Sequence, residues 1–305
     1  MTAPYAYRIG GLAVASETPL AGAIPLAGGA ALASDVFVRL TPVPETLGGA
    51  GDRGPNWELA GDRFLLRVPK LARYLVTAGR TIDVELAPGA TAADASLFVL
   101  GSAFGILLHQ RGDLVLHGSA VARDGTCVAI CGRSGAGKST LAAALGRAGC
   151  AFLADDLCVV RLDEARAPVV SPDGRRLKLW RESVDALELA DRRGEAVRTG
   201  TDKYFIEPPL AAEAVPRLVA VYVLREGQPS PAARIEALSQ PDAMRALDRQ
   251  AYRPVLRARL VARPAMLAMA GAVLRHARVY ALARPRGFAH LDATVAALLE
   301  HWDRL

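Results

Sequence analysis

A glycine-rich loop with one lysine and three hydroxyl residues is the pattern in this chain best suited to chemistry. It fulfils G-x-x-x-x-G-K-[ST] in full. Its glycines let consecutive backbone N–H groups point inward and cradle phosphate oxygens, the lysine reaches the β- and γ-phosphates, and the hydroxyl that follows the lysine can ligate Mg²⁺. The predicted nucleotide-binding residues are Gly132, Arg133, Ser134, Gly135, Ala136, Gly137, Lys138, Ser139 and Thr140.

The segments on either side of the loop fit the strand and helix that such a loop requires. Residues 127–131 form a short apolar strand pattern that enters the loop directly. Residues 139–148 are rich in strong helix formers, and Gly149 is placed to end that helix. The helix N-terminus would point its dipole at bound phosphates. ATP and Mg²⁺ are therefore the expected cofactors, and the preference for ATP over GTP is left open.

An acidic pair, Asp155-Asp156, follows Thr140 by 15 residues at the end of an apolar strand pattern at 150–154. Ligands of parallel sheets bind where adjacent strands end, so we expect this strand to bring Asp155 or Asp156 to the metal and the γ-phosphate. Neighbouring side chains of an extended chain point to opposite sides. One carboxylate can thus face the metal and the reacting hydroxyl, while the other holds the loop. The alternative is a solvated turn at a strand end.

A histidine and three basic residues are further candidates. Residues 114–122 predict a strand that carries His117, which an Asp-Gly turn connects to the loop strand. A histidine in such a strand is more often packed than catalytic. In the charged segment 175–203, three residues can neutralise a transferred phosphoryl group, with solvated surface residues as the alternative. These candidate substrate residues are Arg176, Lys178 and Lys203.

Taken together, the motifs resemble the catalytic core of HPr serine kinase/phosphorylase and its relatives. The resemblance rests on Leu116-His117-Gly118, on the loop from Gly132 to Ser139, and on Leu153-Ala154-Asp155-Asp156, at the separations of that family. It implies a P-loop kinase core akin to the nucleotide domain of phosphoenolpyruvate carboxykinase, and ATP-dependent phosphorylation of a serine. It also implies a homo-oligomer.

The resemblance further implies roles for individual residues. Asp155 and Asp156 would supply the general base and a Mg²⁺-binding or orienting carboxylate, in an order that stays open. Ser139 would ligate the metal, Lys138 would clamp the phosphates, and His117 would adjoin the active site.

Two departures from that family change the expected acceptor. Thr140 stands where HPr kinases usually carry an acidic residue, and their glycine-rich substrate signature has no counterpart in segment 175–203. This combination is more similar to the HPr-kinase-related proteins found beside peptide-modifying genes, including those that phosphorylate lasso-peptide precursors on a terminal serine. A serine-containing peptide or protein, rather than HPr, is the expected substrate.

Composition and charge exclude several other partners. The chain has 305 residues, is 51% hydrophobic and carries a net charge of +6. Its basic residues are not interleaved with aromatic residues in one block, so no nucleic-acid partner is expected. The apolar stretch 21–33 is short and contains Pro25, so no membrane span is expected there. Four cysteines in and around the loop strands favour buried reduced thiols and a cytoplasmic location.

The expected fold class is α/β, in two parts. Residues 1–90 predict a small β-rich N-terminal module, and residues 91–305 predict the ATP-binding catalytic domain. Within the second part we expect the following elements: a helix at 92–110, an irregular charged segment at 166–210, a central strand at 218–224, helices at 242–251 and 254–275, a strand at 279–282 and a helix at 290–302.

Three rival functions remain at this point. A transport or motor ATPase shares the loop, but its L-S-G-G-Q-like signature and its distant strand ending in Asp-Glu are not present at a sensible distance, since Leu162-Asp163-Glu164 comes too early. A nucleotide-dependent binding protein would not need the acidic pair. A small-metabolite kinase is the strongest rival.

Overall fold

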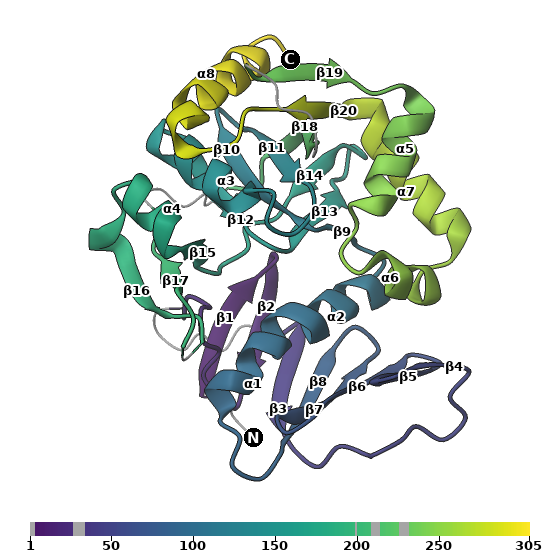
Figure 1. Cartoon of the computed structure of the whole chain (residues 1–305). Coiled ribbons are helices and arrows are strands. Elements are labelled where there is room, and N and C mark those ends of the chain that lie inside the picture. The colour runs from purple at the N-terminus through teal and green to yellow at the C-terminus, as the bar shows by residue number, and fades with distance from the viewer. Residues whose placement is uncertain (1–3, 27–33, 199, 209–213, 226–231) are drawn as a thin grey trace.

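The computed structural model describes residues 4–26, 34–198, 200–208, 214–225 and 232–305. The chain is a mixed α/β protein with an eight-stranded N-terminal sheet, a nine-stranded central sheet and a small three-stranded sheet. A long helix crosses between the two larger sheets (Figure 1).

The N-terminal sheet has the strand order β1-β2-β3-β8-β7-β6-β5-β4. Strand β7 alternates buried and partly buried residues, which is typical of a strand with one face on a core. Its strands are β1 Tyr5–Ile9, β2 Leu12–Ser16, β3 Val36–Leu40, β4 Asp52–Gly54, β5 Trp57–Ala60, β6 Arg63–Val68, β7 Ala72–Thr77 and β8 Thr81–Leu86. The β-rich structure predicted for this part of the chain is therefore present.

The long helix consists of α1 (Ala92–Phe98), a π-helical turn η1 (Val99–Ala103) and α2 (Phe104–Gln110). Its side chains share one core with the N-terminal sheet and with residues that follow β12. By length and mean hydropathy of 1.5 this helix is apolar enough to cross a membrane, but 67% of it is buried inside the protein. Its apolar surface is thus used in packing between the two sheets.

The central sheet carries the phosphate-binding loop. Its order is β12-β10-β11-β18-β14-β13-β9, with β20 also beside β18 and β19 beside β20. Strands β11, β18 and β20 run parallel. The strands are β9 Leu114–Leu116, β10 Gly118–Arg123, β11 Thr126–Cys131, β12 Ala151–Ala154, β13 Cys158–Leu162, β14 Pro168–Val170, β18 Arg217–Leu224, β19 Arg234–Ala237 and β20 Arg278–Ala283.

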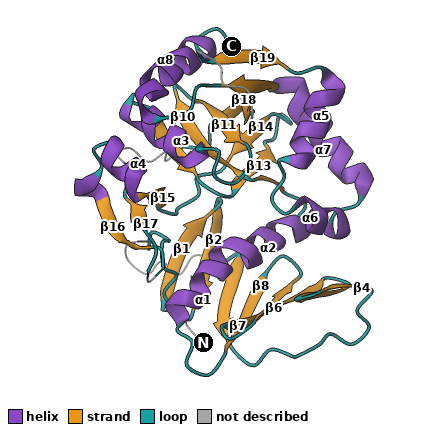
Figure 2. Ribbon diagram, viewed as in Figure 1, coloured by secondary structure: helices purple, strands orange, loops and turns teal. Residues whose placement is uncertain are grey.

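Both faces of this sheet are covered by helices, which explains the continuous apolar runs of its middle strands (Figure 2). In β11, Val128 and Ile130 lie in the core shared with α3 (Lys138–Arg147) and α8 (Leu291–Trp302). The alternate residues lie in the core shared with α5 (Gln240–Arg249) and α7 (Arg263–His276). The four cysteines are free and buried.

Two strand predictions are wrong in detail. The strand predicted at 114–122 breaks at His117, so that β9 pairs with β13 while β10 pairs with β11 and β12. Strand β12 does not lie beside the loop strand β11, because β10 is inserted between them and runs antiparallel to both. Strands β11 and β12 still point the same way, so their carboxyl ends reach the same edge of the sheet.

The segment predicted as irregular, 166–210, is ordered over its described residues. It contains a three-stranded sheet of order β15-β17-β16 that packs beside α3. Its elements after β14 are β15 Leu177–Trp180, α4 Arg181–Ala186, the 3₁₀ turn η2 Ala190–Arg192, β16 Arg193–Ala196 and β17 Lys203–Ile206. The helix predicted at 254–275 is interrupted and forms α6 (Pro254–Leu260) and α7, because Pro264 starts a new helix. A short turn η3 (Phe288–His290) precedes α8.

Candidate active site

The phosphate-binding loop connects β11 to α3. Gly135 and Gly137 have φ angles of +80° and +86°, which glycine adopts without strain. Gly137 caps α3, so the first N–H groups of this helix are free of intrahelical partners and point toward the loop. The loop is therefore built as an anion site.

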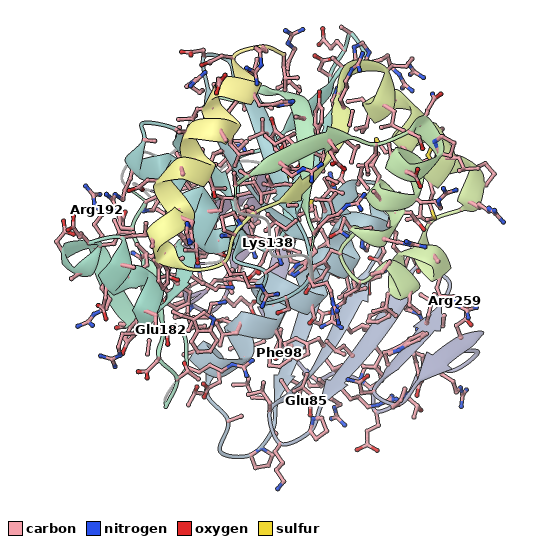
Figure 3. The ribbon with its side chains drawn as sticks, turned by 45° about the horizontal axis from the view of Figure 1, so that its top comes forward. Glu85, Phe98, Lys138, Glu182, Arg192 and Arg259 are labelled. Carbon is pink, nitrogen blue, oxygen red and sulfur yellow. The ribbon has the colours of Figure 1, made fainter. Side chains whose placement is uncertain are left out.

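Lys138 lies over this loop and is 7% exposed. Its Nζ donates hydrogen bonds to the carbonyls of Gly132 and Arg133, both at 3.0 Å. Burial lowers the pKa of Lys138, although the nearby carboxylates Asp155 and Asp156 oppose that change. In Figure 3 Lys138 lies near the centre of the view, while Arg192 and Arg259 lie toward its edges.

Asp155 is the carboxylate that meets the loop. Its Oδ1 accepts hydrogen bonds from Ser119 Oγ at 2.7 Å and from Ser139 Oγ at 2.8 Å. Its Oδ2 is buried and has no hydrogen-bond partner among the described residues. Burial, and secondarily the charge of Asp156, raises the pKa of Asp155. An unpaired buried carboxylate oxygen beside a serine hydroxyl is therefore available at the end of β12.

These two side chains fit a magnesium ion that is shared with a nucleotide. Mg²⁺ prefers oxygen ligands and is commonly held by one or two carboxylates together with substrate phosphates and water. Within the described residues, no cluster of three or more His, Cys, Asp or Glu side chains could hold a metal. Asp155 and Ser139 would thus supply the protein ligands, and phosphates and water would have to supply the rest.

Asp156 has a different partner from Asp155. Its φ of +68° reverses the chain, and its Oδ2 lies 3.1 Å from Lys178 Nζ. Its carbonyl accepts a hydrogen bond from His117 Nδ1 at 3.2 Å. Burial by itself would raise the pKa of Asp156, but the charges of Lys178, Arg175 and Lys203 hold it well below its usual value. The two carboxylates thus have separate partners, one in the loop and one in β15.

A buried ion pair between Arg175 and Asp173 contacts the backbone of the acidic pair. Arg175 Nε donates to Asp173 Oδ1 at 2.6 Å, and the two side chains are 4% and 2% exposed. Arg175 also donates to the carbonyls of Leu100 at 2.7 Å and Asp155 at 3.1 Å. Sequence reasoning missed both residues, because charged residues in a Pro-Asp-Gly-Arg-Arg run are typical of an exposed turn.

The structure brings some of the predicted basic residues together with the acidic pair. Lys178 pairs with Asp156 directly, and Lys203 lies close enough for its charge to act on the same carboxylate. Arg176 instead forms an ion pair with Glu207 at 3.4 Å and lines a separate cavity of about 690 Å³ between the first strands and the small sheet. Arg176 is therefore paired with Glu207 and not with the acidic pair.

The hydroxyl of Thr140 does not face the phosphate loop. It forms a hydrogen bond with the hydroxyl of Ser183, in α4, at 2.9 Å. The backbone N–H of Thr140, in the first turn of α3, remains available for a phosphate.

Sequence reasoning also missed Arg284, which follows β20. Its Nη2 donates to the Ala136 carbonyl at 3.0 Å, and a side chain on Gly137 would collide with its guanidinium. Burial, with repulsion from Arg286, lowers the pKa of Arg284. Because β20 runs parallel to β11, its carboxyl end reaches the edge of the sheet where the loop lies. The position of Arg284 directly after this strand is the sequence feature that could have identified it.

Comparisons with known proteins give little further information. No family model matches the sequence, and no curated protein matches it. Among solved structures, the chain is similar to the HPr(Ser) kinase/phosphatase from Coxiella burnetii, with a TM-score of 0.33 and 14% identity over 62% of this chain and 98% of that one. At that score the similarity is distant, and the roles of the site residues are inferred from the distances and burial described above.

Proposed function

We propose that this protein is a kinase that transfers the γ-phosphoryl group of ATP to a serine hydroxyl of a peptide or protein. The observation that carries the proposal is the 2.8 Å hydrogen bond between Ser139 and Asp155. It joins the metal-binding hydroxyl of a complete phosphate loop to a carboxylate that has a second, adjacent carboxylate beside it. A loop that only binds a nucleotide does not need the second carboxylate.

The surroundings of the two carboxylates support different roles for them. Asp155 is 5% exposed and bonded to two serine hydroxyls, so it is suited to holding Mg²⁺ with Ser139. The Asp156 side chain is 35% exposed, so an acceptor hydroxyl can reach it. When bound, Mg²⁺ would neutralise charge on the phosphates. Lys138 and the N-terminus of α3 would bind the same phosphates.

The reaction balances with these groups. The serine Oγ forms a bond to the γ-phosphorus as the bond from that phosphorus to the β–γ bridging oxygen breaks, and ADP leaves with the electron pair. The serine proton passes to the Asp156 carboxylate and from there to water. Phosphoryl transfer proceeds through a loose transition state, so positioning and charge neutralisation matter more than a strong base. The lowered pKa of Asp156 is compatible with this role.

A transfer assay tests the proposal. The purified protein is incubated with Mg²⁺, γ-labelled ATP and a pool of synthetic peptides, in which a central serine is flanked by randomised residues. We expect phosphoserine in the pool and a loss of about 100-fold or more in Asp156→Asn. The control is Asp185→Asn, which changes an exposed aspartate on α4.

Three outcomes would contradict the proposal. Release of inorganic phosphate at one rate, with or without peptide, would identify an ATPase. Transfer to free metabolite hydroxyls alone would identify a small-metabolite kinase. Full transfer by an Asp155→Asn/Asp156→Asn double variant would show that the reaction needs neither carboxylate. A lasso-peptide precursor is a specific acceptor to include in the assay.

A further inference from the structure

A cavity of about 340 Å³ borders the start of the phosphate loop and has no role in the chemistry above. Its lining comes from the end of β9, the loop itself and the connection between α5 and α6. The lining residues are His117, Gly132, Arg133, Arg249, Gln250, Ala251, Tyr252, Arg253 and Pro254.

This cavity borders the part of the loop that Lys138 contacts. The lysine of a phosphate loop reaches the β- and γ-phosphates. Here Lys138 Nζ lies 3.0 Å from the carbonyls of Gly132 and Arg133, and these two residues border the cavity. On the other side, His117 lines the cavity and is bonded to the carbonyl of Asp156. An acceptor that presents its hydroxyl to Asp156 would therefore lie against this cavity.

The outer wall of the cavity is fixed by backbone pairing to β9. His117 N–H donates to the Gln250 carbonyl and Tyr252 N–H donates to the Val115 carbonyl, both at 2.7 Å, and Leu116 bridges to Ala251. The Tyr252 carbonyl accepts a further hydrogen bond from His109 Nε2 at 2.8 Å. The wall is thus held in place before any ligand binds.

Two arginines on this wall carry charge without an acidic partner. Arg249 ends α5 and Arg253 caps α6, both are exposed, and neither forms an ion pair within the described part of the chain. Arg253 is oriented by a hydrogen bond from its Nη2 to Ser102 Oγ at 2.7 Å and lies over the Tyr252 ring. The cavity lining contains no aspartate or glutamate.

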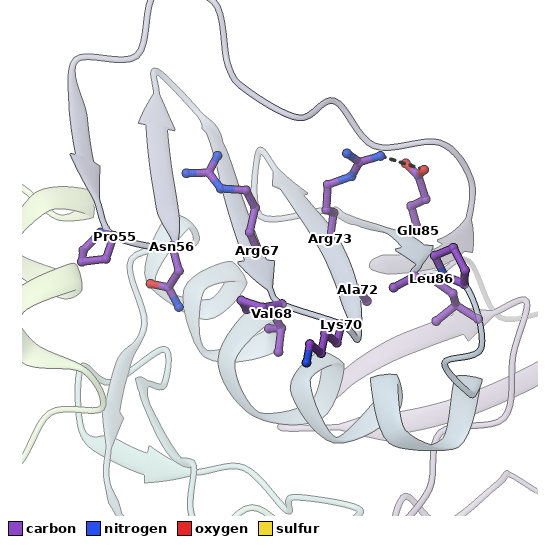
Figure 4. Close-up of a pocket in the computed structure, with 12 residues that line it drawn as sticks. Pro55, Asn56, Arg67, Val68, Lys70, Ala72, Arg73, Glu85 and Leu86 are labelled. Atoms are coloured by element: carbon purple, nitrogen blue, oxygen red, sulfur yellow. Dashed lines mark hydrogen bonds and ion pairs between the residues drawn. The ribbon is translucent and has the colours of Figure 1, made fainter.

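A second cavity, of about 470 Å³ on the N-terminal sheet, provides a contrast (Figure 4). There, Arg73 pairs with Glu85 at 2.8 Å, as the dashed line in Figure 4 marks, and Arg67 pairs with Glu58 at 2.8 Å. The arginines of that cavity have their carboxylates within the chain. Arg249 and Arg253 have no carboxylate partner among the described residues, and guanidinium groups bind planar anions such as carboxylates well.

We infer that the cavity beside the loop binds a carboxylate of the acceptor, close to the phosphorylated serine, through Arg249 and Arg253. The inference rests on the proposed function and adds a substrate class to it. The nucleotide phosphates have their own donors in the loop, in α3 and in Lys138. The carboxylate comes either from an aspartate or glutamate beside the serine or from the C-terminus of the acceptor chain.

Three synthetic peptides distinguish these sources. The first has aspartates on both sides of the serine and an amidated C-terminus, and the second has asparagines in their place. The third has asparagine before a C-terminal serine with a free carboxylate. We expect kcat/KM at least about fivefold higher for the first or the third peptide than for the second, chiefly through KM.

The variants Arg249→Gln and Arg253→Gln should each reduce that preference, and Arg249→Glu should reverse it. The control is Arg245→Gln, on the same helix, whose side chain pairs with Asp242 outside this cavity. Equal kcat/KM for all three peptides in the wild-type protein would overturn the inference while leaving the proposed function intact. A preference for carboxylate-bearing peptides that is unchanged in both Arg249→Gln and Arg253→Gln would also overturn the inference.

If neither these three peptides nor the randomised pool is phosphorylated, the proposed function fails and the inference is decided by binding. The same peptides, each with a fluorophore, are then titrated with the protein and followed by anisotropy. Tighter binding of a carboxylate-bearing peptide that weakens in Arg249→Gln would support the cavity assignment. Equal binding of the peptides, or none, would overturn it.

Discussion

The Asp155 carboxylate accepts a hydrogen bond from the Ser139 hydroxyl at 2.8 Å, although β12 and β11, the strands that precede these two residues, are not adjacent in the sheet. Strand β10 lies between β11 and β12, and its Ser119 donates to the same Oδ1 atom at 2.7 Å. The intervening strand therefore orients the carboxylate without separating it from the loop. The second oxygen, Oδ2, is left without a partner in the described residues.

Ser119→Ala should weaken magnesium dependence rather than abolish activity, because it removes one of two hydrogen bonds that orient Asp155. We expect the Mg²⁺ concentration for half-maximal transfer to rise about 10-fold or more. Ser119→Thr, which keeps the hydroxyl, should restore most of the loss. The control is Ser171→Ala, whose hydroxyl contacts Arg161 away from the acidic pair. An unchanged magnesium requirement in Ser119→Ala would contradict this role.

Ser139→Ala and Thr140→Ala should have different effects although the two residues are neighbours. Ser139→Ala removes the hydroxyl that we propose as a Mg²⁺ ligand, so we expect a strong loss of Mg²⁺-dependent activity. Thr140→Ala removes only the hydrogen bond to Ser183, so we expect a loss of about 1 kcal/mol in the free energy of unfolding and near-normal transfer. Denaturant titration and a transfer assay on both variants check this. Equal loss of activity would show that the Thr140 hydroxyl contacts the nucleotide.

Arg284→Gln should weaken nucleotide binding by about 10-fold, because it removes a positive charge next to the phosphate loop. Glutamine retains a donor for the Ala136 carbonyl, so the loop geometry is preserved. Calorimetric titration with Mg-ATP measures the change, and it should be smaller with adenosine. Arg286→Gln is the neighbouring control. Equal weakening for ATP and adenosine would argue against a phosphate contact.

Asp173→Asn should destabilise the fold strongly. It leaves the Arg175 guanidinium, which is 4% exposed, without its charge partner. Removing one member of a buried pair costs about 3–5 kcal/mol. The free energy of unfolding from urea titration measures this cost, and Asp202→Asn, in an exposed pair with Arg181, should cost about 1 kcal/mol or less. Similar losses of unfolding free energy in Asp173→Asn and Asp202→Asn would show that burial does not increase the contribution of the Asp173–Arg175 pair.

Stability should fall as the solution becomes acidic, partly through His109. This side chain is 1% exposed, and burial lowers its pKa in the folded chain. The unfolded chain therefore takes up a proton near pH 6.5 that the folded chain excludes. The stabilisation is complete above that pH and decreases as the pH falls toward the folded-state pKa, by up to about 1.4 kcal/mol per pH unit.

Unfolding titrations at pH 7.5 and 5.5 measure this dependence. His109→Gln, which can still donate to the Tyr252 carbonyl, should reduce the difference between the two pH values. His290→Gln, at an exposed position, should not. An equal pH dependence in the wild-type protein and His109→Gln would exclude this histidine as a cause.

Local signals in the sequence determined the loop and its two flanking elements. A strand, the glycines of residues 132–137 and helix α3 depend on backbone preferences and on contacts over a few residues. The positions of Asp155 and Asp156 at a strand end were determined in the same way. For these features, the type and spacing of residues contain nearly all the necessary information.

Tertiary structure decided which of these residues meet. The insertion of β10 beside β11, the choice of Lys178 over Arg176 as the partner of Asp156, and the approach of Arg284 to the loop all depend on strand order. So does the pairing of residues 250–252 with β9. Strand partners and the burial of charged groups are selected by the free energy of the whole packed chain, to which distant segments contribute. A local pattern cannot contain that information.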